Sequence, residues 1–357
     1  MRVLALVPHR TGHAPGQRGS IELWESVLAA AGIEIEFAPF ETERLRQILH
    51  QSGNHWDKSV EMVKAYGERL GLLKRLDEYD AVFVYREAAL LGPAYLERAI
   101  AKKKPIIYQL DDPLFVPYKS PSNGLFSYFK FFGKVKEIIA MSKVVMVNST
   151  KIREYAEQFN QNIWQIPSVV DTEKFTFEPP KLNGRVCVGW SGSPTTLRNV
   201  KMIEKPLRRI SEAKTCNIHL IGGENFGLEG VDHTAQKWKL ETEIQDLRKI
   251  QIGLVPLPGD NPWNPYKFIM KTAQYMALGI VPVGTPMASN NEVIKHGENG
   301  FLAKTDDEWV EYISILASDE VLRKRLSERS AADAQACYSL RANTPKIIAA
   351  FRSAIAS

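Results

Sequence analysis

The chain has 357 residues, 44% of them hydrophobic and 24% charged, which is typical of a globular protein large enough for more than one core. A net charge of +5 does not by itself indicate nucleic-acid binding, but it suits anionic small molecules or a membrane surface. No apolar run approaches 18 residues, so no membrane-spanning helix is predicted. Cys187, Cys216 and Cys337 lie far apart, which excludes a C-x-x-C metal site and favours a reduced, cytoplasmic compartment.

Short apolar strands alternate with helical segments through the first half of the chain, which predicts a parallel sheet covered by helices. Strands are expected at 2–8, 33–40, 80–86, 104–112 and 143–150. Helices are expected at 20–32, over most of 41–78, and at 151–160. Ser20 is the expected N-cap of the first helix, with Ile21, Trp24 and Leu28 on its buried face.

The strand-and-helix pattern restarts after a Pro-rich extended stretch at 163–184, where we expect a domain boundary. Further strands are predicted at 185–192, 217–223, 250–257 and 280–285. Two successive α/β units of similar size predict two Rossmann-like domains, at 1–168 and 169–340, whose parallel sheets face a central cleft. The amphipathic end of the chain, 341–357, is expected as a helix that packs back on the first domain.

The stretch GWSGSPTTLRNV ends a predicted strand and opens a helix, the edge of an α/β sheet where ligands bind. Backbone N–H groups at such an edge favour a phosphate, and Gly192 permits close approach. Hydroxyls from Ser193, Thr195 and Thr196 and the guanidinium of Arg198 complete a predicted diphosphate site. The alternative is a polar turn that caps the helix.

The stretch NPWNPYKFIMKTAQYMALG places two lysines at the entrance of a predicted helix. Lys267, Lys271 and Gln274 are spaced i, i+4 and i+7, so on one helix they share a face. Cations are unfavourable at a helix N-terminus unless an anion lies among them. We therefore expect Lys271 to contact a diphosphate with Lys267 nearby; the alternative is a solvated basic turn.

Polar residues also follow strands of the first domain. Gly16 and Arg18 lie in the loop after the first strand, again at an edge of the sheet where ligands bind. Asp111 and Asp112 end another strand, and adjacent carboxylates there are expected to point apart. One is then a candidate proton acceptor at a ligand-binding edge, and the other is expected to cap the loop; alternatively both are caps. No D-x-D motif in a suitable setting occurs, so no catalytic metal is predicted.

Two histidines, His9 and His13, lie in the same first loop, where either is a candidate general base and the alternative is a solvated surface side chain. Arg86 and Glu87, after the strand at 80–86, are expected to support the wall formed by the two aspartates.

Residues 125–143 mix aromatic side chains with lysines and predict peripheral contact with an anionic membrane surface. Lys130, Lys134 and Lys136 would form its basic face. The alternative is an ordinary helix that packs phenylalanine and isoleucine into the core while its lysines face water.

Ordered motifs along nearly the whole chain resemble the GT-B glycosyltransferases of family 4, in particular a bacterial branch. The second half carries GWSGSPTT, IGLVPLPGD, KTAQYMALGIVPV and NNEVIKHGENGFLAKTDDEW. The first half carries PGQRGSIELW, DAVFVYREA, YQLDDPLF and IPSVVDTEKF. The resemblance implies retaining, metal-independent transfer of a sugar from a UDP- or GDP-type donor to a glycan or lipid-linked acceptor, with no cofactor and no nucleic acid, in bacterial polysaccharide biosynthesis. The donor is expected on the second domain and the acceptor on the first.

The resemblance also implies roles for individual residues. Asn290 and Glu292 would line the donor site, and Trp238 with Lys239 would meet the nucleobase, although Trp238 is alternatively a core anchor. The family's paired glutamates, E-x(7)-E, are replaced here by Tyr266 and Gln274. Arg198 and Lys271 would stabilise the departing charge, and Gly16 and Arg18 would reach the donor phosphates or the acceptor. One of Asp111 and Asp112 would orient the donor sugar or accept a proton from the acceptor hydroxyl. The alternatives are an inactive GT-B binding or scaffold protein, or an epimerase or phosphorylase of the same fold.

Overall fold

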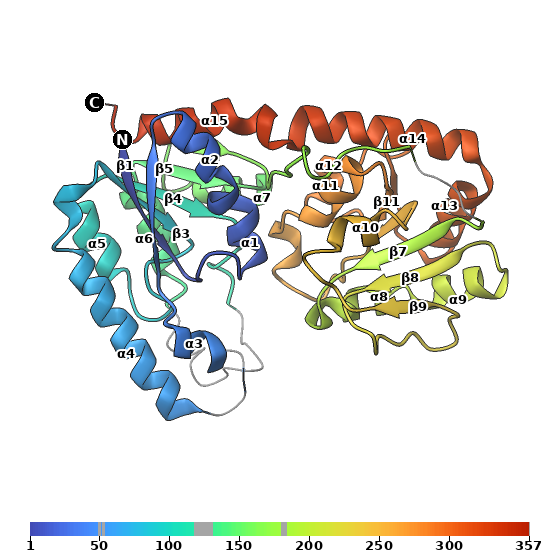
Figure 1. The fold of residues 1–357 in the computed structure, drawn as a ribbon, viewed down its shortest axis with the longest axis horizontal. Coiled ribbons are helices and arrows are strands. Elements are labelled where there is room, and N and C mark those ends of the chain that lie inside the picture. Colours follow the sequence, from blue (N-terminus) through green and yellow to red (C-terminus); the bar gives the residue numbers. More distant parts are fainter. Residues whose placement is uncertain (49–50, 52–53, 118–130, 180–183, 357) are drawn as a thin grey trace. The chain divides into compact units, whose positions relative to one another are not determined.

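The computed structural model describes residues 1–48, 51, 54–117, 131–179 and 184–356. The chain forms two compact units, which are described separately. Unit 1 comprises Met1–Ser168 with Asn343–Ser357, and unit 2 comprises Val169–Ala342. Each unit contains one six-stranded sheet in which all strand pairs are parallel, and helices surround it (Figure 1). The predicted α/β architecture with parallel sheets is therefore confirmed. None of the helices described is long and apolar enough to cross a membrane.

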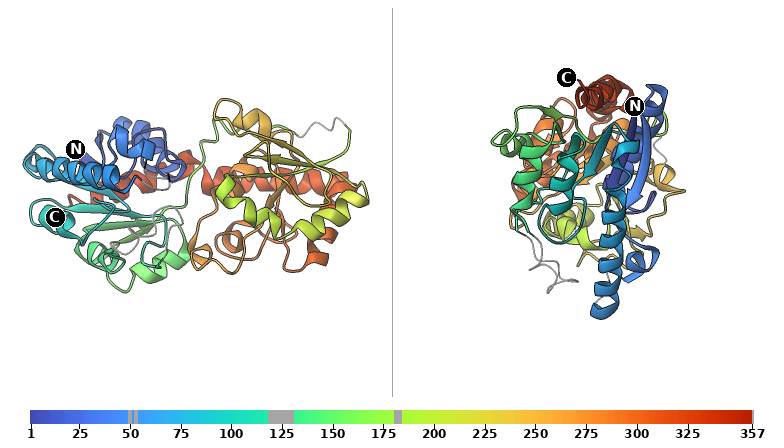
Figure 2. Two further views of the ribbon diagram at one scale, coloured as in Figure 1. Left: turned by 90° about the horizontal axis from the view of Figure 1, so that it is seen from below. Right: turned by 90° about the vertical axis from the view of Figure 1, so that its left-hand side faces the viewer.

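The sheet of unit 1 has the strand order β2-β1-β3-β4-β5-β6. Its strands are β1 (Arg2–Val7), β2 (Glu34–Pro39), β3 (Ala81–Tyr85), β4 (Ile106–Leu110), β5 (Val144–Val147) and β6 (Ile163–Gln165). Every residue of β3, β4 and β5 is buried, because helices cover both faces of the sheet (Figures 1 and 2). Burial on both faces explains why these strands read as continuous apolar runs.

The helices of unit 1 are α1 (Pro15–Gln17), α2 (Leu23–Ala30), α3 (Glu43–Ile48), α4 (His55–Leu72), α5 (Tyr95–Ala101), α6 (Lys134–Met141) and α7 (Thr150–Ala156). A π-helical turn (Arg18–Glu22) joins α1 to α2, and a 3₁₀ turn (Leu76–Glu78) precedes β3. The last helix, α15 (Leu340–Ser353), packs on this unit from Asn343 onward. Phe351 stacks on Phe83 of β3 with ring centroids 5.5 Å apart, and Arg352 donates to the carbonyl of Ala31.

The expectation that Ser20 caps the first helix is wrong. Its backbone is non-helical (φ −130°, ψ −115°), and α2 begins only at Leu23. The buried Ser20 hydroxyl instead donates to Oε1 of Gln109, 2.7 Å away, and so ties the loop after β1 to β4. Ile21, Trp24 and Leu28 are buried together, as the helical spacing predicted.

The predicted basic membrane face does not hold at Lys134, the first residue of α6. The Lys134 side chain is buried, and its Nζ lies 2.7 Å from Glu87 and 2.8 Å from the carbonyl oxygen of Ala89. Ile138 and Ile139 on the same helix are buried in the core. Helix α6 therefore packs its isoleucines into the core as the alternative expects, but of its two lysines only Lys136 is exposed as that alternative also expects. Lys130 and the rest of 125–130 lie outside the described residues.

The sheet of unit 2 has the strand order β12-β11-β10-β7-β8-β9. Its strands are β7 (Cys187–Ser191), β8 (Asn217–Ile221), β9 (Thr234–Gln236), β10 (Ile252–Val255), β11 (Val281–Gly284) and β12 (Phe301–Leu302). The chain runs outward from β7 through β8 and β9, then returns to the other side of β7 at β10. The pair β7 and β10 is therefore the point where the strand order reverses.

The helices of unit 2 are α8 (Leu197–Lys201), α9 (Glu204–Glu212), α10 (Glu243–Leu247), α11 (Met270–Ala277), α12 (Asn290–Val293), α13 (Asp306–Ser318) and α14 (Glu320–Asp333). Short turns lie at Pro194–Thr196, Asn264–Tyr266 and Ala334–Tyr338. Helix α11 packs closely on β10 because a Cβ atom at Gly253 would lie 2.3 Å from the ring of Tyr275. This close packing fixes the position of α11 against the sheet.

Candidate functional site

The residues predicted to bind a diphosphate follow the two strands at the reversal point of unit 2. The chain leaves β7 at Gly192 and leaves β10 toward Lys267 and Lys271. Loops after two such neighbouring strands run apart and leave room for a ligand at the carboxyl edge of the sheet. The topology thus brings together two segments that are about 75 residues apart in the sequence.

The turn after β7 is held by its own hydroxyl groups and by β8. The N–H of Gly192 donates to the carbonyl of Ile221, 2.8 Å away. The hydroxyls of Ser193 and Thr195 lie 2.8 Å apart, and the Thr196 hydroxyl donates to the carbonyl of Ser193. These bonds support the turn-capping alternative for the hydroxyls, while the Ser193 and Thr195 side chains remain exposed.

Gly192 rests directly on the indole of Trp190. A Cβ atom added at Gly192 would lie 2.2 Å from Cζ2 and 2.4 Å from Cη2 of that ring. The ring cannot give way easily, because Trp190 is 1% exposed and belongs to the main core of unit 2. The position therefore requires glycine, and the backbone of the turn is held against an aromatic surface.

The same indole lies beneath Lys271, whose Nζ is 4.9 Å from the ring centroid. An aromatic face stabilises a cation at this distance. Burial, with a smaller effect from Lys267, lowers the pKa of Lys271 to about 8. No carboxylate pairs with Lys271 among the residues described. Trp190 therefore brings the Gly192 turn and an ammonium group without an acidic partner to one place.

Lys267 does not share a helical face with Lys271, contrary to the expectation. Its backbone is extended (φ −72°, ψ 137°), and α11 begins only at Met270. Ser289 holds the intervening segment, because its hydroxyl accepts from the N–H of Ile269 and its own N–H donates to the carbonyl of Lys267. The i, i+4 spacing was misleading because the Asn264–Tyr266 turn and the extended residues after it precede the helix.

Tyr275 joins α11 to the end of β7. Its hydroxyl accepts a hydrogen bond from the buried N–H of Ser191, 2.9 Å away. Sequence reasoning missed both Tyr275 and Trp190, since each lies in an apolar run that predicts only core packing. The available signal was the position of Trp190 two residues before the glycine of the predicted turn.

The remaining donor-site predictions have different structural settings. Arg198 is exposed on α8, and none of the described residues forms an ion pair with it. Trp238 packs against a core cluster that includes Leu247, and its Nε1 donates to Glu243, 3.1 Å away, which fits the core-anchor alternative. Lys239 is exposed beside it.

Asn290 has a structural setting that the donor-site prediction did not anticipate. The residue is fully buried, and its Nδ2 donates to the carbonyl oxygens of Val255 and Thr285. Its Oδ1 accepts from the hydroxyl of Thr272 on α11. Both amide protons are therefore used to hold the loops after β10 and β11. Glu292, on the same short helix, is exposed, and Gln274 on α11 is partly buried.

In unit 1, Asp111 and Asp112 converge on one guanidinium, so the expectation that they point apart is wrong. Asp111 accepts from the Tyr85 hydroxyl at 2.5 Å and from Nε of Arg86 at 2.7 Å, and Asp112 lies 2.7 Å from Nη2 of Arg86. Both aspartates follow the last residue of β4, where strand alternation no longer applies. Burial lowers the pKa of Arg86, but the two carboxylates outweigh it and hold that pKa well above its usual value.

The loop after β1 packs on this cluster. A Cβ atom at Gly16 would lie 2.8 Å from the hydroxyl of Tyr85 and 3.2 Å from Oδ2 of Asp111. Arg18 is partly buried at the start of the following turn. His9 is also held in place, with Nδ1 3.0 Å from Glu41, whereas His13 is exposed.

Across the described parts of the chain, no three histidine, cysteine, aspartate or glutamate side chains are grouped so that they could hold a metal ion.

One family model matches part of this chain. Residues 268–333, all within unit 2, match the family model "Glycosyl transferases group 1". No curated protein matches the chain.

Solved structures share the fold at low sequence identity. Sucrose-phosphate synthase from Thermosynechococcus elongatus is 13% identical over 99% of this chain and 98% of its own, with a TM-score of 0.72. Anabaena Alr3699/HepE, solved in complex with UDP, is 14% identical over 99% and 100%, with a TM-score of 0.68. The apo lipopolysaccharide outer core galactosyltransferase WaaB is 16% identical over 99% of both chains, with a TM-score of 0.67.

These matches confirm the predicted GT-B fold class and the predicted enzyme class, a glycosyltransferase.

Proposed function

We propose that the chain is a glycosyltransferase that binds the diphosphate of a nucleotide sugar between the Gly192 turn and Lys271. One observation carries the proposal: the turn and the ammonium group lie against the same Trp190 indole, at the strand-reversal point of unit 2. A phosphate there would receive backbone N–H groups that follow Gly192, whose own N–H is bonded to Ile221, and the exposed hydroxyls of the turn from one side. From the other side it would receive an ammonium without an acidic partner.

The proposed chemistry is stabilisation of the leaving diphosphate. Negative charge grows on the diphosphate as its bond to the sugar breaks, and preorganised positive groups stabilise that charge. Lys271 is the main contributor in this proposal, with Lys267 and the exposed Arg198 as nearby cations. We propose a reaction that requires no metal and retains the anomeric configuration, with the incoming hydroxyl arriving on the side from which the diphosphate leaves.

UDP is the first nucleotide to test, because the HepE structures hold UDP or UDP-glucose. Gln274 is placed on α11 with Lys271 and offers an amide to a ribose diol. We propose that unit 1 binds the acceptor, a glycan or a lipid-linked sugar, in bacterial glycan biosynthesis at the cytoplasmic side of the membrane.

The test is a transfer assay with UDP- and GDP-sugars and a panel of acceptors, with and without EDTA, followed by NMR of the product's anomeric proton. The proposal expects an acceptor-dependent product of unchanged anomeric configuration in the presence of EDTA. Release of an altered sugar nucleotide without acceptor would favour an epimerase. Nucleotide binding without turnover would favour an inactive binding protein.

A further inference from the structure

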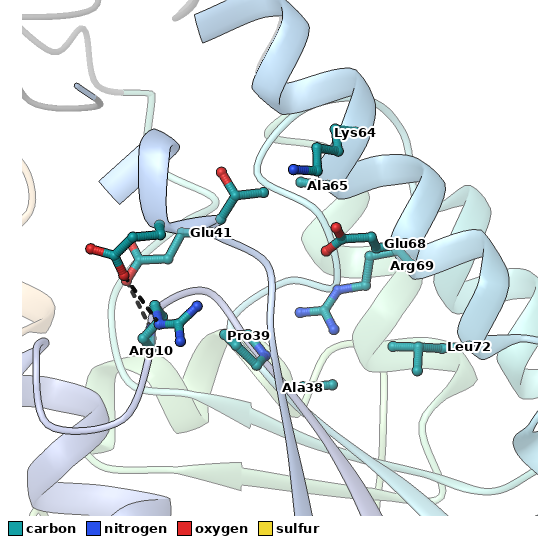
Figure 3. Close-up of a pocket in the computed structure, with 11 residues that line it drawn as sticks. Arg10, Ala38, Pro39, Glu41, Lys64, Ala65, Glu68, Arg69 and Leu72 are labelled. Carbon is teal, nitrogen blue, oxygen red and sulfur yellow. Dashed lines mark hydrogen bonds and ion pairs between the residues drawn. The ribbon is translucent and has the colours of Figure 1, made fainter. Parts of the chain in front are cut away.

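Unit 1 contains a cavity of about 400 Å³ between α4 and the carboxyl ends of β1 and β2. Figure 3 shows charged side chains from the loops after both strands and from α4 directed toward this space. The lining residues used below are Arg10, Glu41, Glu43, Lys64, Glu68 and Arg69. The volume falls in the range of pockets that hold small molecules, and it is sufficient for a sugar ring.

Arg69 is a buried cation in the wall of this cavity, only 3% exposed. Its Nε donates to the carbonyl of Ala88 and its Nη2 to the carbonyl of Val7, each at 2.9 Å. A guanidinium carries five N–H groups, so most of its donors remain after these two bonds. Figure 3 shows the group extending from α4 toward Pro39 and Arg10.

No acidic side chain within the described ranges lies at ion-pair distance from Arg69. Burial lowers the pKa of Arg69 to about 9, and the more distant Glu97 and Glu68 only partly oppose this effect. The protein supplies Arg69 with two backbone carbonyls and with the ring of Phe40, whose centroid lies 5.8 Å from Cζ, but with no full negative charge. A buried guanidinium that no carboxylate compensates is costly, which points to an anionic partner from outside the chain.

Two of the three carboxylates in the cavity wall already have partners within the protein. Glu41 is buried and accepts from Nδ1 of His9 at 3.0 Å and from the N–H of Arg10 at 2.8 Å. Glu43 pairs with Arg46 at 2.5 Å and with Arg10 at 3.6 Å. The other charged side chains of the wall, Arg69, Lys64 and Glu68, form no ion pair in the described structure. Two of these three charges are positive, so the cavity favours an anion.

We propose that this cavity binds an acidic group, a carboxylate or a phosphate, carried by the sugar of the acceptor substrate. The planar fork of Arg69 matches the geometry of either oxyanion, and Lys64 at the rim adds a mobile second charge. The inference rests on the proposed function, which assigns the acceptor to unit 1. A carboxylate would come from a uronic acid and a phosphate from a phosphorylated sugar.

The experiment is calorimetric titration of the full chain with glucuronate, glucose 6-phosphate and glucose in the presence of saturating UDP, which keeps phosphate out of unit 2. We expect at least one acidic sugar to bind about tenfold more tightly than glucose, since hydrogen bonds to charged groups contribute this much. The acid that binds identifies the source. Equal binding of all three sugars, or no binding, would overturn the proposal.

Variants test the location of binding. Lys64→Met is expected to weaken binding of the acidic sugar about two- to fivefold, and Glu68→Gln to strengthen it by a similar factor, as for exposed charges. Lys103→Met, an exposed lysine on the turn after α5, is the matched control and should change nothing. Arg69→Met should weaken binding about tenfold or more. If the Arg69→Met variant does not fold, the opposite effects of the Lys64 and Glu68 substitutions on affinity still test whether the acidic sugar binds in this cavity.

The two proposals fail in different ways. UDP binding without charge-dependent sugar binding would refute the acidic acceptor site and leave the donor site intact. Absence of UDP binding would refute the donor site, and the Lys64 and Glu68 variants, titrated without UDP, would still test the cavity in unit 1.

Discussion

Replacing Gly192 with alanine should disrupt the donor site through one methyl group. The new Cβ would lie 2.2 Å from Cζ2 of Trp190, whereas ordinary van der Waals contact begins at 3.4 Å, so the turn must move by about 1.2 Å. The indole is buried in the core, so the turn rather than the ring is expected to shift.

This shift has two measurable consequences. Overpacking of this kind typically costs about 1–3 kcal/mol of unfolding free energy. A displacement of about 1 Å at a positioning group costs on the order of 10²-fold in turnover. We therefore expect Gly192→Ala to lose about a hundredfold in kcat/KM and to bind UDP at least about tenfold more weakly.

The assay combines urea unfolding, UDP calorimetry and initial rates on the purified variant. Gly227→Ala is the matched control, because a Cβ there meets nothing within 4 Å in the same unit. A folded Gly192→Ala protein with UDP affinity and turnover like those of the control would refute the assignment of this turn to the donor site.

Three further predictions concern residues around the same site. Lys271→Met should weaken UDP binding about tenfold, because the ammonium form binds the diphosphate. In the unsubstituted protein the UDP affinity should fall about fivefold from pH 7 to pH 9, because the pKa of Lys271 is about 8 in the free protein and the neutral amine is expected to bind as weakly as the Met variant. A pH profile unchanged by the substitution, measured by calorimetry, would contradict this. Tyr275→Phe should cost about 1–3 kcal/mol in urea unfolding, since the buried Ser191 N–H loses its acceptor. Tyr312→Phe is the control and should cost little, because the hydroxyl of Tyr312, on α13, makes no hydrogen bond among the described residues. Asn290→Ala should lower the unfolding free energy by about 2–3 kcal/mol, because it removes hydrogen bonds that the buried amide makes. Weaker UDP binding at unchanged stability would contradict this expectation and indicate that Asn290 contacts the donor.

Much of the fold was predictable because its strands are buried on both faces. Fully buried parallel strands such as β3 and β5 require continuous β-branched and aromatic runs, and these are visible without a structure. The alternation of such runs with helical segments predicts parallel sheets. The glycine turn after β7 is visible in the sequence because it directly follows one of these apolar runs.

The errors arose where tertiary contacts decide the local conformation. Lys267 has helical spacing with Lys271, but the extended segment held by Ser289 precedes the helix. Asp111 and Asp112 were treated as strand residues, yet both lie beyond β4 and bind Arg86. No local sequence pattern shows that the guanidinium of Arg86 will bind both carboxylates, because Arg86 follows a different strand.

The buried cation of unit 1 was also invisible to sequence reasoning. Arg69 lies on a long amphipathic helix, where an arginine is usually solvated. Its burial follows from two backbone carbonyls, those of Val7 and Ala88, which come from different parts of the chain.

The most direct test of the central claim is a crystal structure of the protein with a UDP-sugar. The account predicts that the diphosphate lies beside the Gly192 turn, with an oxygen within about 3 Å of the Lys271 ammonium, the distance of a charge-assisted hydrogen bond. A diphosphate found elsewhere, with Lys271 still resting alone over Trp190, would contradict it.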